Sequence, residues 1–171
     1  DIEKAIKEAS INLKKKKIRS ALLDSEILMS KVLNKDKKFV ILNSDKEINK
    51  NDYKNFKELV SFRLKKKPIA YLTGKKSFWK YDFKVNENVL IPRPDSELII
   101  EQVLKIYKNK ECINFLEIGV GSGCLILSIL KEKRSFLGKG IDLSKDSLKI
   151  CKVNADMLRL SERLKLFKSD I

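Results

Sequence analysis

Apolar positions in the first 70 residues recur at the spacing of an α-helix. Ile2, Ile6, Ala9 and Leu13 form one stripe, which predicts an amphipathic helix. Residues 21–33 carry a wider stripe, which indicates a helix in the centre of a small bundle. The first part of the chain is therefore predicted to be all-helical.

Two further helical segments follow in this part of the chain. Residues 39–42 predict one or two turns, and a longer helix that ends before Pro68 is indicated by Tyr53, Phe56, Val60 and Leu64. Asp24 and Glu26 lie inside the apolar helix, where we expect them to cap or to pair locally.

The apolar period changes from helical to alternating after Pro68. Polar residues separate Trp79, Tyr81, Phe83 and Val85, a pattern typical of a half-buried strand. We expect a turn at residues 86–88 and a return strand at 89–91. A β-hairpin linker over residues 73–91 is therefore predicted.

Strand and helix patterns alternate in the remainder of the sequence. The expected elements are a strand at 113–118, a helix at 124–132, a strand at 139–143, a helix at 145–159 with Ser144 as N-cap, and a strand at 164–168. This order is typical of a parallel sheet with crossover helices. The predicted fold class is α/β: a helical bundle, a hairpin linker and part of a Rossmann-like domain.

A glycine-rich turn joins the first of these strands to its helix, and an acid follows the second strand. Asp142 lies nineteen residues after the last of three alternating glycines. Glycines let the backbone approach a ligand closely, and a carboxylate can accept hydrogen bonds from a ribose diol. A dinucleotide fingerprint would need glycine at Cys124, so the spacing favours a different nucleotide-type cofactor. A turn without a ligand is the less favoured alternative. The candidate cofactor-binding residues here are Glu117, Gly119, Val120, Gly121, Ser122, Gly123 and Asp142.

Two prolines flank Arg93 in the loop before the sheet. Pro92 and Pro94 stiffen the backbone on both sides, so Arg93 is a candidate active-site residue. The alternative is a surface salt bridge. Residues 95–97 suit the start of a helix.

Composition excludes several classes of chemistry. The chain has no histidine, which removes Ser-His and Cys-His mechanisms and histidine-based metal sites. Its three cysteines lack metal-ligand spacing, so we expect no metal and reduced thiols in a cytoplasmic protein. The longest apolar stretch is too short to span a membrane, and we expect neither a signal peptide nor a membrane partner.

The charge balance is strongly basic. The chain has 38 basic and 23 acidic residues, giving +15, and such a charge favours weak association with nucleic acid. However, 32 of the basic residues are lysine, and the runs at 14–17 and 65–67 have no interleaved aromatics. General surface bias is therefore favoured over a dedicated nucleic-acid site.

Several motifs together resemble the HemK/PrmC family of protein-(glutamine-N5) methyltransferases. They are the runs at 68–74 and 77–79, the loop at 90–97 and the Gly-x-Gly-x-Gly motif, which is shared with class I S-adenosylmethionine methyltransferases. Ser96 stands where the family more often has threonine, and Glu117 where it more often has aspartate.

The resemblance implies a function and a division of the chain. It implies that residues 1–72 dock a peptide chain release factor and that residues 92–171 bind S-adenosylmethionine, which methylates the glutamine of a Gly-Gly-Gln motif. Asp142 would hold the ribose, Asp170 and Ile171 would border the adenine, and Arg93 with its prolines would lie near the active-site mouth.

The catalytic Asn-Pro-Pro-Tyr motif that the resemblance implies does not occur in these 171 residues. We therefore assign no catalytic residue, expect cofactor binding without efficient turnover, and hypothesise that the sequence is the N-terminal piece of a longer protein. Such a piece would leave one sheet edge and much apolar surface uncovered.

Two alternatives remain open at this point. A nucleic-acid methyltransferase acting on tRNA would account for the charge and would share the glycine motif. A non-catalytic partner-docking module would bind a protein through the helical bundle without binding a cofactor.

Overall fold

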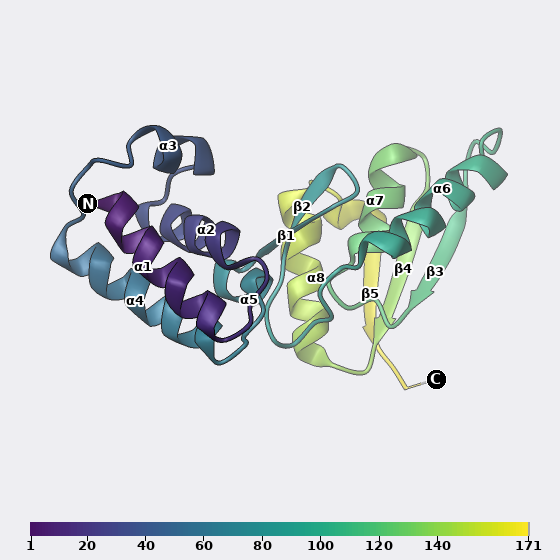
Figure 1. Cartoon of the computed structure of the whole chain (residues 1–171). Coiled ribbons are helices and arrows are strands. Elements are labelled where there is room, and N and C mark those ends of the chain that lie inside the picture. The colour runs from purple at the N-terminus through teal and green to yellow at the C-terminus, as the bar shows by residue number, and fades with distance from the viewer. Residues whose placement is uncertain (171) are drawn as a thin grey trace. The chain divides into compact units, whose positions relative to one another are not determined.

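The computed structural model describes residues 1–170, which form two compact units that divide after Thr73. The first unit is helical, as predicted. Its elements are α1 (Ile2–Lys15), α2 (Ala21–Leu33), α3 (Lys37–Leu42), α4 (Lys50–Leu64) and α5 (Ile69–Thr73) (Figure 1).

The predicted apolar stripes form the core of the helical unit. Ile6 of α1, Leu28 and Met29 of α2 and Phe56 of α4 are buried in one cluster. Asp1 caps helix α1, because its carboxylate accepts a hydrogen bond from the N–H of Lys4 at 2.7 Å. The helical period therefore identified part of this core, whereas Leu22 and Leu23 of the wide stripe in α2 are 53% and 46% exposed.

The expectation that Asp24 and Glu26 pair locally is wrong. Asp24 is buried and pairs with Arg63 of α4, with Nε and Oδ2 2.7 Å apart. Glu26 pairs with Lys37 at the start of α3, at 3.4 Å. Because α2 packs against both α3 and α4, these carboxylates meet partners that the spacing within one helix cannot indicate.

The second unit contains a hairpin and a parallel sheet with its helices. The hairpin strands are β1 (Lys75–Phe78) and β2 (Tyr81–Lys84). The remaining elements are η1 (Pro94–Ser96), α6 (Glu97–Ile106), β3 (Asn114–Ile118), α7 (Cys124–Glu132), β4 (Leu137–Asp142), α8 (Lys145–Met157), η2 (Ser161–Arg163) and β5 (Leu164–Lys168).

The sheet is parallel, with the order β3-β4-β5, as expected for strands joined by crossover helices. One face of this sheet, which carries Phe115, Gly138, Leu164 and Leu166, packs against α7 and α8 in the core of the unit. The unit therefore has the Rossmann-like α/β arrangement that the sequence predicted.

Side chains on the other face of the sheet are exposed. Leu116 and Ile118 of β3 are 51% and 63% exposed, and Phe167 of β5 is 46% exposed. These residues share a face by the strand register. The exposed apolar surface that the sequence led us to expect thus lies on this face.

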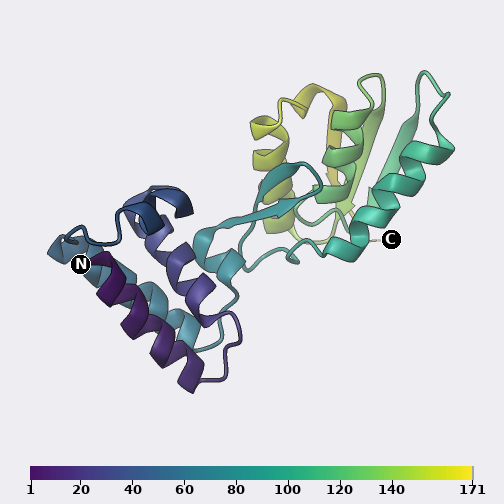
Figure 2. The ribbon, with the colours of Figure 1, turned by 45° about the horizontal axis from the view of Figure 1, so that its top comes forward.

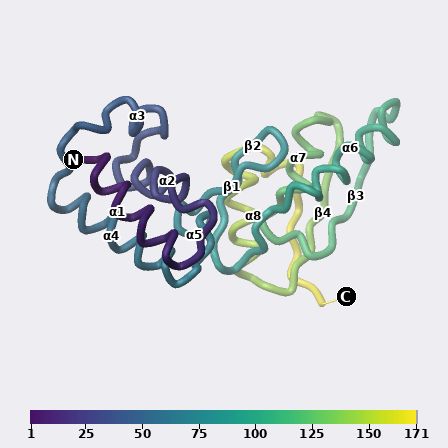
Figure 3. Tube along the Cα trace, in the orientation of Figure 1, coloured from purple at the N-terminus to yellow at the C-terminus, as the bar shows by residue number. Residues whose placement is uncertain are grey.

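The hairpin exists, but its predicted register is wrong. The two strands, which lie side by side in Figure 3, pair Lys75 with Lys84 and Phe78 with Tyr81, so the hairpin turn falls at residues 79–80. The predicted turn at 86–88 is present, because the N–H of Val89 donates to the carbonyl of Asn86 at 3.2 Å, but the predicted return strand at 89–91 is not. Trp79 adopts a positive φ of 54° and so reverses the chain. The alternating aromatic row therefore crosses the turn instead of lying in one strand.

Three side-chain donors fasten the hairpin turn to α7. The indole Nε1 of Trp79 and the hydroxyl of Tyr81 donate to Glu132 Oε1 at 2.9 and 3.2 Å, and Lys80 Nζ donates to Oε2 at 3.0 Å. Phe78 and Phe83 are buried in the same core as α7. The hairpin is thus packed into the second unit.

The buried ion pair yields a stability prediction. Arg63→Met should lower the free energy of unfolding by about 3 kcal/mol or more, because it leaves the Asp24 carboxylate buried without a partner. Urea unfolding followed by circular dichroism measures this.

The control is Lys37→Met, which breaks a more exposed pair and should cost at most about 1 kcal/mol. Adding Asp24→Leu to Arg63→Met should recover much of the loss. Equal losses for the two single variants would contradict the prediction.

Candidate functional site

The glycine-rich turn lies at the carboxyl end of β3 and is held against the next strand. The N–H groups of Gly119 and Val120 both donate to the carbonyl of Ile141 in β4, at 2.8 and 2.9 Å. The turn then leads into α7 through Gly123. The loop is therefore anchored where the ends of two parallel strands meet, which is the usual ligand-binding edge of such sheets.

The glycines are required for two different reasons. Gly119 has a φ of 73°, but a Cβ there would meet nothing within 4 Å, so its need is conformational. Gly123 has a φ of 77°, and its Cβ would lie 2.6 Å from the Sγ of Cys151 and 2.9 Å from Leu127. The loop is thus packed against α8 at one end and open at the other.

Asp142 connects the end of β4 to the glycine loop. Its Oδ2 accepts the N–H of Gly121 and its Oδ1 accepts the N–H of Ser144, both at 2.9 Å. An ionised carboxylate has about four lone-pair positions, so two remain for the hydroxyls of a ligand. Asp142 can therefore both shape the loop and hold a diol.

Glu117 lies in β3 on the face covered by α7. Its Oε2 accepts the N–H of Ile126 in the first turn of that helix, at 2.9 Å. Desolvation by burial raises the pKa of Glu117 to about 7, and the hydrogen bond from Ile126 opposes this only in part. The carboxyl group is thus poised to change its charge near neutral pH.

Asn154 of α8 was not singled out from the sequence, yet it joins the hairpin to the glycine loop. It is 1% exposed. Its Oδ1 accepts the N–H of Lys84 at 2.7 Å, and its Nδ2 donates to the carbonyls of Lys84 and Ser122 at 3.0 and 2.8 Å. The sequence offered one indication of this role: an amide side chain next to the buried apolar stripe of α8.

The proline-flanked loop contributes to the hairpin turn. Pro92 is buried, whereas Arg93 is exposed and has no ion pair among residues 1–170, so the surface salt bridge is not found there. Glu97, from the same motif, accepts the N–H of Trp79 at 2.7 Å. The motif therefore helps to fix the hairpin turn.

The third strand ends beside Asp142. The N–H of Ser169 donates to the Asp142 carbonyl at 3.3 Å, and Asp170 follows as an exposed residue. Ile171 lies outside the described residues. Asp170 is thus near the correct edge of the sheet for the role that the resemblance implies.

The cysteines are not arranged as metal ligands. Over residues 1–170, no group of three or more histidine, cysteine or acidic side chains could hold a metal ion. Desolvation by burial raises the pKa of Cys124 to about 11 and that of Cys151 to about 12, so both thiols are protonated near neutral pH.

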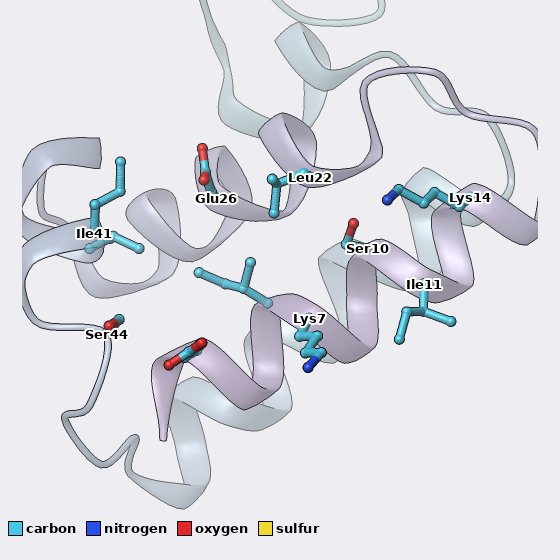
Figure 4. Close-up of a pocket in the computed structure, with 11 residues that line it drawn as sticks. Lys7, Ser10, Ile11, Lys14, Leu22, Glu26, Ile41 and Ser44 are labelled. Carbon is cyan, nitrogen blue, oxygen red and sulfur yellow. The ribbon is translucent and has the colours of Figure 1, made fainter.

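The helical unit carries a separate groove of about 510 Å³ between α1, α2 and α3 (Figure 4). Ile6 and Val40 are among the apolar residues that line it, and Lys7 and Glu26 are among the charged ones. Ile41 at its edge is 51% exposed. Such a groove can accept apolar side chains of a protein partner.

The parallel sheet, the glycine loop and the acid at the end of the second strand define a Rossmann-like domain of the class I methyltransferase type. Two solved structures are similar over just under half of the chain. YjhP from E. coli is 26% identical, with a TM-score of 0.41, and the match covers 47% of this chain and 32% of that one. A SAM-dependent methyltransferase from Geobacter sulfurreducens in complex with S-adenosyl-L-homocysteine is 20% identical, with a TM-score of 0.39 and coverages of 46% and 30%.

Residues 4–74 match the PrmC N-terminal domain family. The release factor glutamine methyltransferase of Clostridium acetobutylicum is 38% identical over 86% of this chain and 52% of its own length. That of Leptospira interrogans is 36% identical over 97% and 59%. A bifunctional methyltransferase of Rickettsia conorii is 31% identical over 99% and 37%.

These similarities confirm the resemblance to the HemK/PrmC family that the sequence motifs indicated. The chain spans about half the length of the release factor glutamine methyltransferases that it matches.

Removing the Asn154 amide should destabilise the second unit. Asn154→Ala removes the hydrogen bonds to the partly buried N–H and carbonyl of Lys84 and to the buried carbonyl of Ser122, so we expect a loss of about 2–4 kcal/mol in the free energy of unfolding. The measurement is urea unfolding followed by the fluorescence of Trp79. Asn88→Ala, at an exposed position, is the control and should change stability by less than about 0.5 kcal/mol. Similar values for both variants would be inconsistent with a bridging role.

Glu117 predicts a pH dependence of stability. The pKa of Glu117 is raised from 4.5 to about 7 in the folded state. Its contribution to the free energy of unfolding is therefore fully present below about pH 4.5 and is lost as the pH rises through about 7. The total is on the order of 3 kcal/mol, since each tenfold change in proton affinity corresponds to about 1.4 kcal/mol.

The matched variant is Glu117→Gln, which still accepts the N–H of Ile126 but does not titrate. The difference in unfolding free energy between the two proteins, measured from pH 4 to pH 8 without a ligand, should change sharply between these limits. Parallel curves would show that Glu117 does not carry the effect.

Proposed function

We propose that this chain supplies the cofactor-binding and substrate-docking parts of an enzyme that methylates the glutamine side-chain amide of peptide chain release factors. The observation that carries the proposal is the bond between Asp142 and Gly121, which joins the glycine loop to the acid at the ligand-binding edge of the sheet. It occurs in a chain that resembles release factor glutamine methyltransferases over most of its length.

The proposed cofactor is S-adenosylmethionine, bound along the glycine loop. Residues 119–123 would line its methionine end, and the free lone pairs of Asp142 would accept the ribose hydroxyls. Asp170 and Ile171 would border the adenine. The carboxyl group of Glu117 would support this site by holding the first turn of α7 through the N–H of Ile126.

The helical unit is proposed to dock the release factor, and the groove between α1, α2 and α3 is a surface that suits apolar side chains of that partner. Residues 73–91 would link this docking domain to the methyltransferase domain, with the mouth of the active site near Arg93. The glutamine within a Gly-Gly-Gln motif is the proposed methyl acceptor.

An amide nitrogen is a poor nucleophile and must be aimed at the methyl group. The Asn-Pro-Pro-Tyr run that the resemblance assigns to this task is not among these residues. We therefore propose that they bind the cofactor without efficient turnover. No helix within residues 1–170 is long and apolar enough to cross a bilayer. We propose a cytoplasmic location, in keeping with a release factor as partner.

Cofactor binding is the first test. Asp142→Ala should weaken S-adenosylmethionine binding, measured by isothermal titration calorimetry on the 171-residue chain, by about 1–3 kcal/mol, because two hydrogen bonds to the ribose and the anchor of the loop are lost. Asp146→Ala, which removes an exposed acid that pairs with Lys149, should leave the affinity unchanged. Equal affinities for all three proteins would refute the assigned site.

Methyl transfer is tested with the full product of the reading frame that encodes this chain. Labelled S-adenosylmethionine is supplied with a release factor and total tRNA together. The label should appear on the release factor and disappear when its Gly-Gly-Gln glutamine is changed to alanine. Label on tRNA alone would replace this proposal with a nucleic-acid methyltransferase.

A further inference from the structure

Two lysine runs that are far apart in the sequence lie side by side in the helical unit. Residues 14–17 follow the buried Leu13 at the end of α1, and residues 65–67 follow Leu64 at the end of α4. Leu64 packs against the cluster of Leu13 and Ile18, so the two helix ends are neighbours. Figures 1 and 2 show α1 and α4 ending on the same side of the unit.

The two helix ends have the same backbone geometry. In α1 the N–H of Ile18 donates to the carbonyl of Leu13 at 3.2 Å, and in α4 the N–H of Lys67 donates to the carbonyl of Phe62 at 3.2 Å. Each bond spans five residues and closes a Schellman-type helix end. The chain therefore turns away from both helices in the same manner.

A lysine occupies the left-handed position of each turn. Lys17 has a φ of 59° and Lys66 a φ of 65°. This position is usually glycine, because a Cβ is strained there. Both helices thus end on an exposed lysine where glycine would be more stable.

The surrounding sequence contains no acid to neutralise these charges. No aspartate or glutamate occurs between Ala9 and Leu23 or between Leu59 and Thr73. The nearby Asp24 is buried and already paired with Arg63. We name the resulting surface the lysine face. Its members are exposed and have no ion pair in the described part of the chain: Lys14, Lys15, Lys16, Lys17, Arg19, Lys65 and Lys66.

We propose that the lysine face binds the phosphate backbone of single-stranded RNA. Clustered like charges repel one another, and a polyanion relieves this repulsion while releasing its own counterions. Two adjacent runs of point charges suit a flexible chain of phosphates that can follow both. Duplex DNA is stiff on this scale and is less suited to do so.

Other anionic partners fit the surface less well. A membrane-surface helix needs a free apolar face, but the stripe of α1 that contains Ile2, Ile6 and Leu13 is buried in the core. The ring of Phe62 makes cation–π contacts with Lys65 and Lys67, whose ammonium groups lie 5.9 and 5.3 Å from its centre. This aromatic ring is therefore not free to stack on a base. Recognition is therefore of the backbone and independent of base sequence.

The test uses the left-handed lysines. The double variant Lys17→Gly with Lys66→Gly should melt at the same or a higher temperature, because glycine relieves the strain, yet it should bind RNA more weakly. Fluorescence anisotropy of a labelled uridine 20-mer measures the affinity at several salt concentrations. The slope of log affinity against log salt should become shallower by about 1.4, since each phosphate contact on a single strand contributes about 0.7.

The matched control lies in the second unit. Arg159 also occupies a left-handed position after a helix, with a φ of 57°, and Lys152 is exposed on the same helix. Arg159→Gly with Lys152→Gln removes the same charge without touching the lysine face, and should leave the salt slope unchanged.

Three results would overturn the proposal. Equal changes in both double variants would mean that net charge alone attracts RNA. Tighter binding to duplex DNA, or to phosphatidylglycerol vesicles at the same phosphate concentration, would assign the face to another polyanion. Competition by polyglutamate as effective as that by unlabelled RNA would assign it to an acidic protein segment.

Discussion

The second unit depends on one buried amide. Asn154 uses both ends of its side chain, accepting from and donating to the backbone of Lys84 and also donating to the carbonyl of Ser122. A hairpin strand, a helix and the glycine loop are thereby fixed by a single residue. An apolar residue of the same size would remove all three of these hydrogen bonds and leave the buried carbonyl of Ser122 without its side-chain donor, which costs stability.

The glycine loop of the candidate site is held by Asn154 together with Asp142. Asn154 holds the end of the loop, next to α7, through Ser122, while Asp142 holds its middle through the N–H of Gly121. The loop is therefore ordered by the protein before any ligand binds. Ordering a loop in advance lowers the entropy that a ligand must overcome, which is a general route to affinity.

Much of this arrangement could be predicted from the sequence because it depends on local periodicity. The bounds of α7 agree with the prediction, and the strand predicted at 164–168 is β5. The failures lie where distant residues decide. The turn at Trp79 depends on Glu97 and Glu132, and the pairing of Asp24 depends on a residue in another helix. Asn154 was missed for the same reason, since its two partner residues, Lys84 and Ser122, lie outside its own helix.

Trp79 has a consequence for how the molecule can be observed. It is the only tryptophan in the chain, and its indole is held by Glu132 at the end of α7. Its emission therefore reports the environment of the hairpin turn in the second unit. Loosening of the second unit can thus be followed through this one residue, and a ligand that tightens the unit has a built-in reporter.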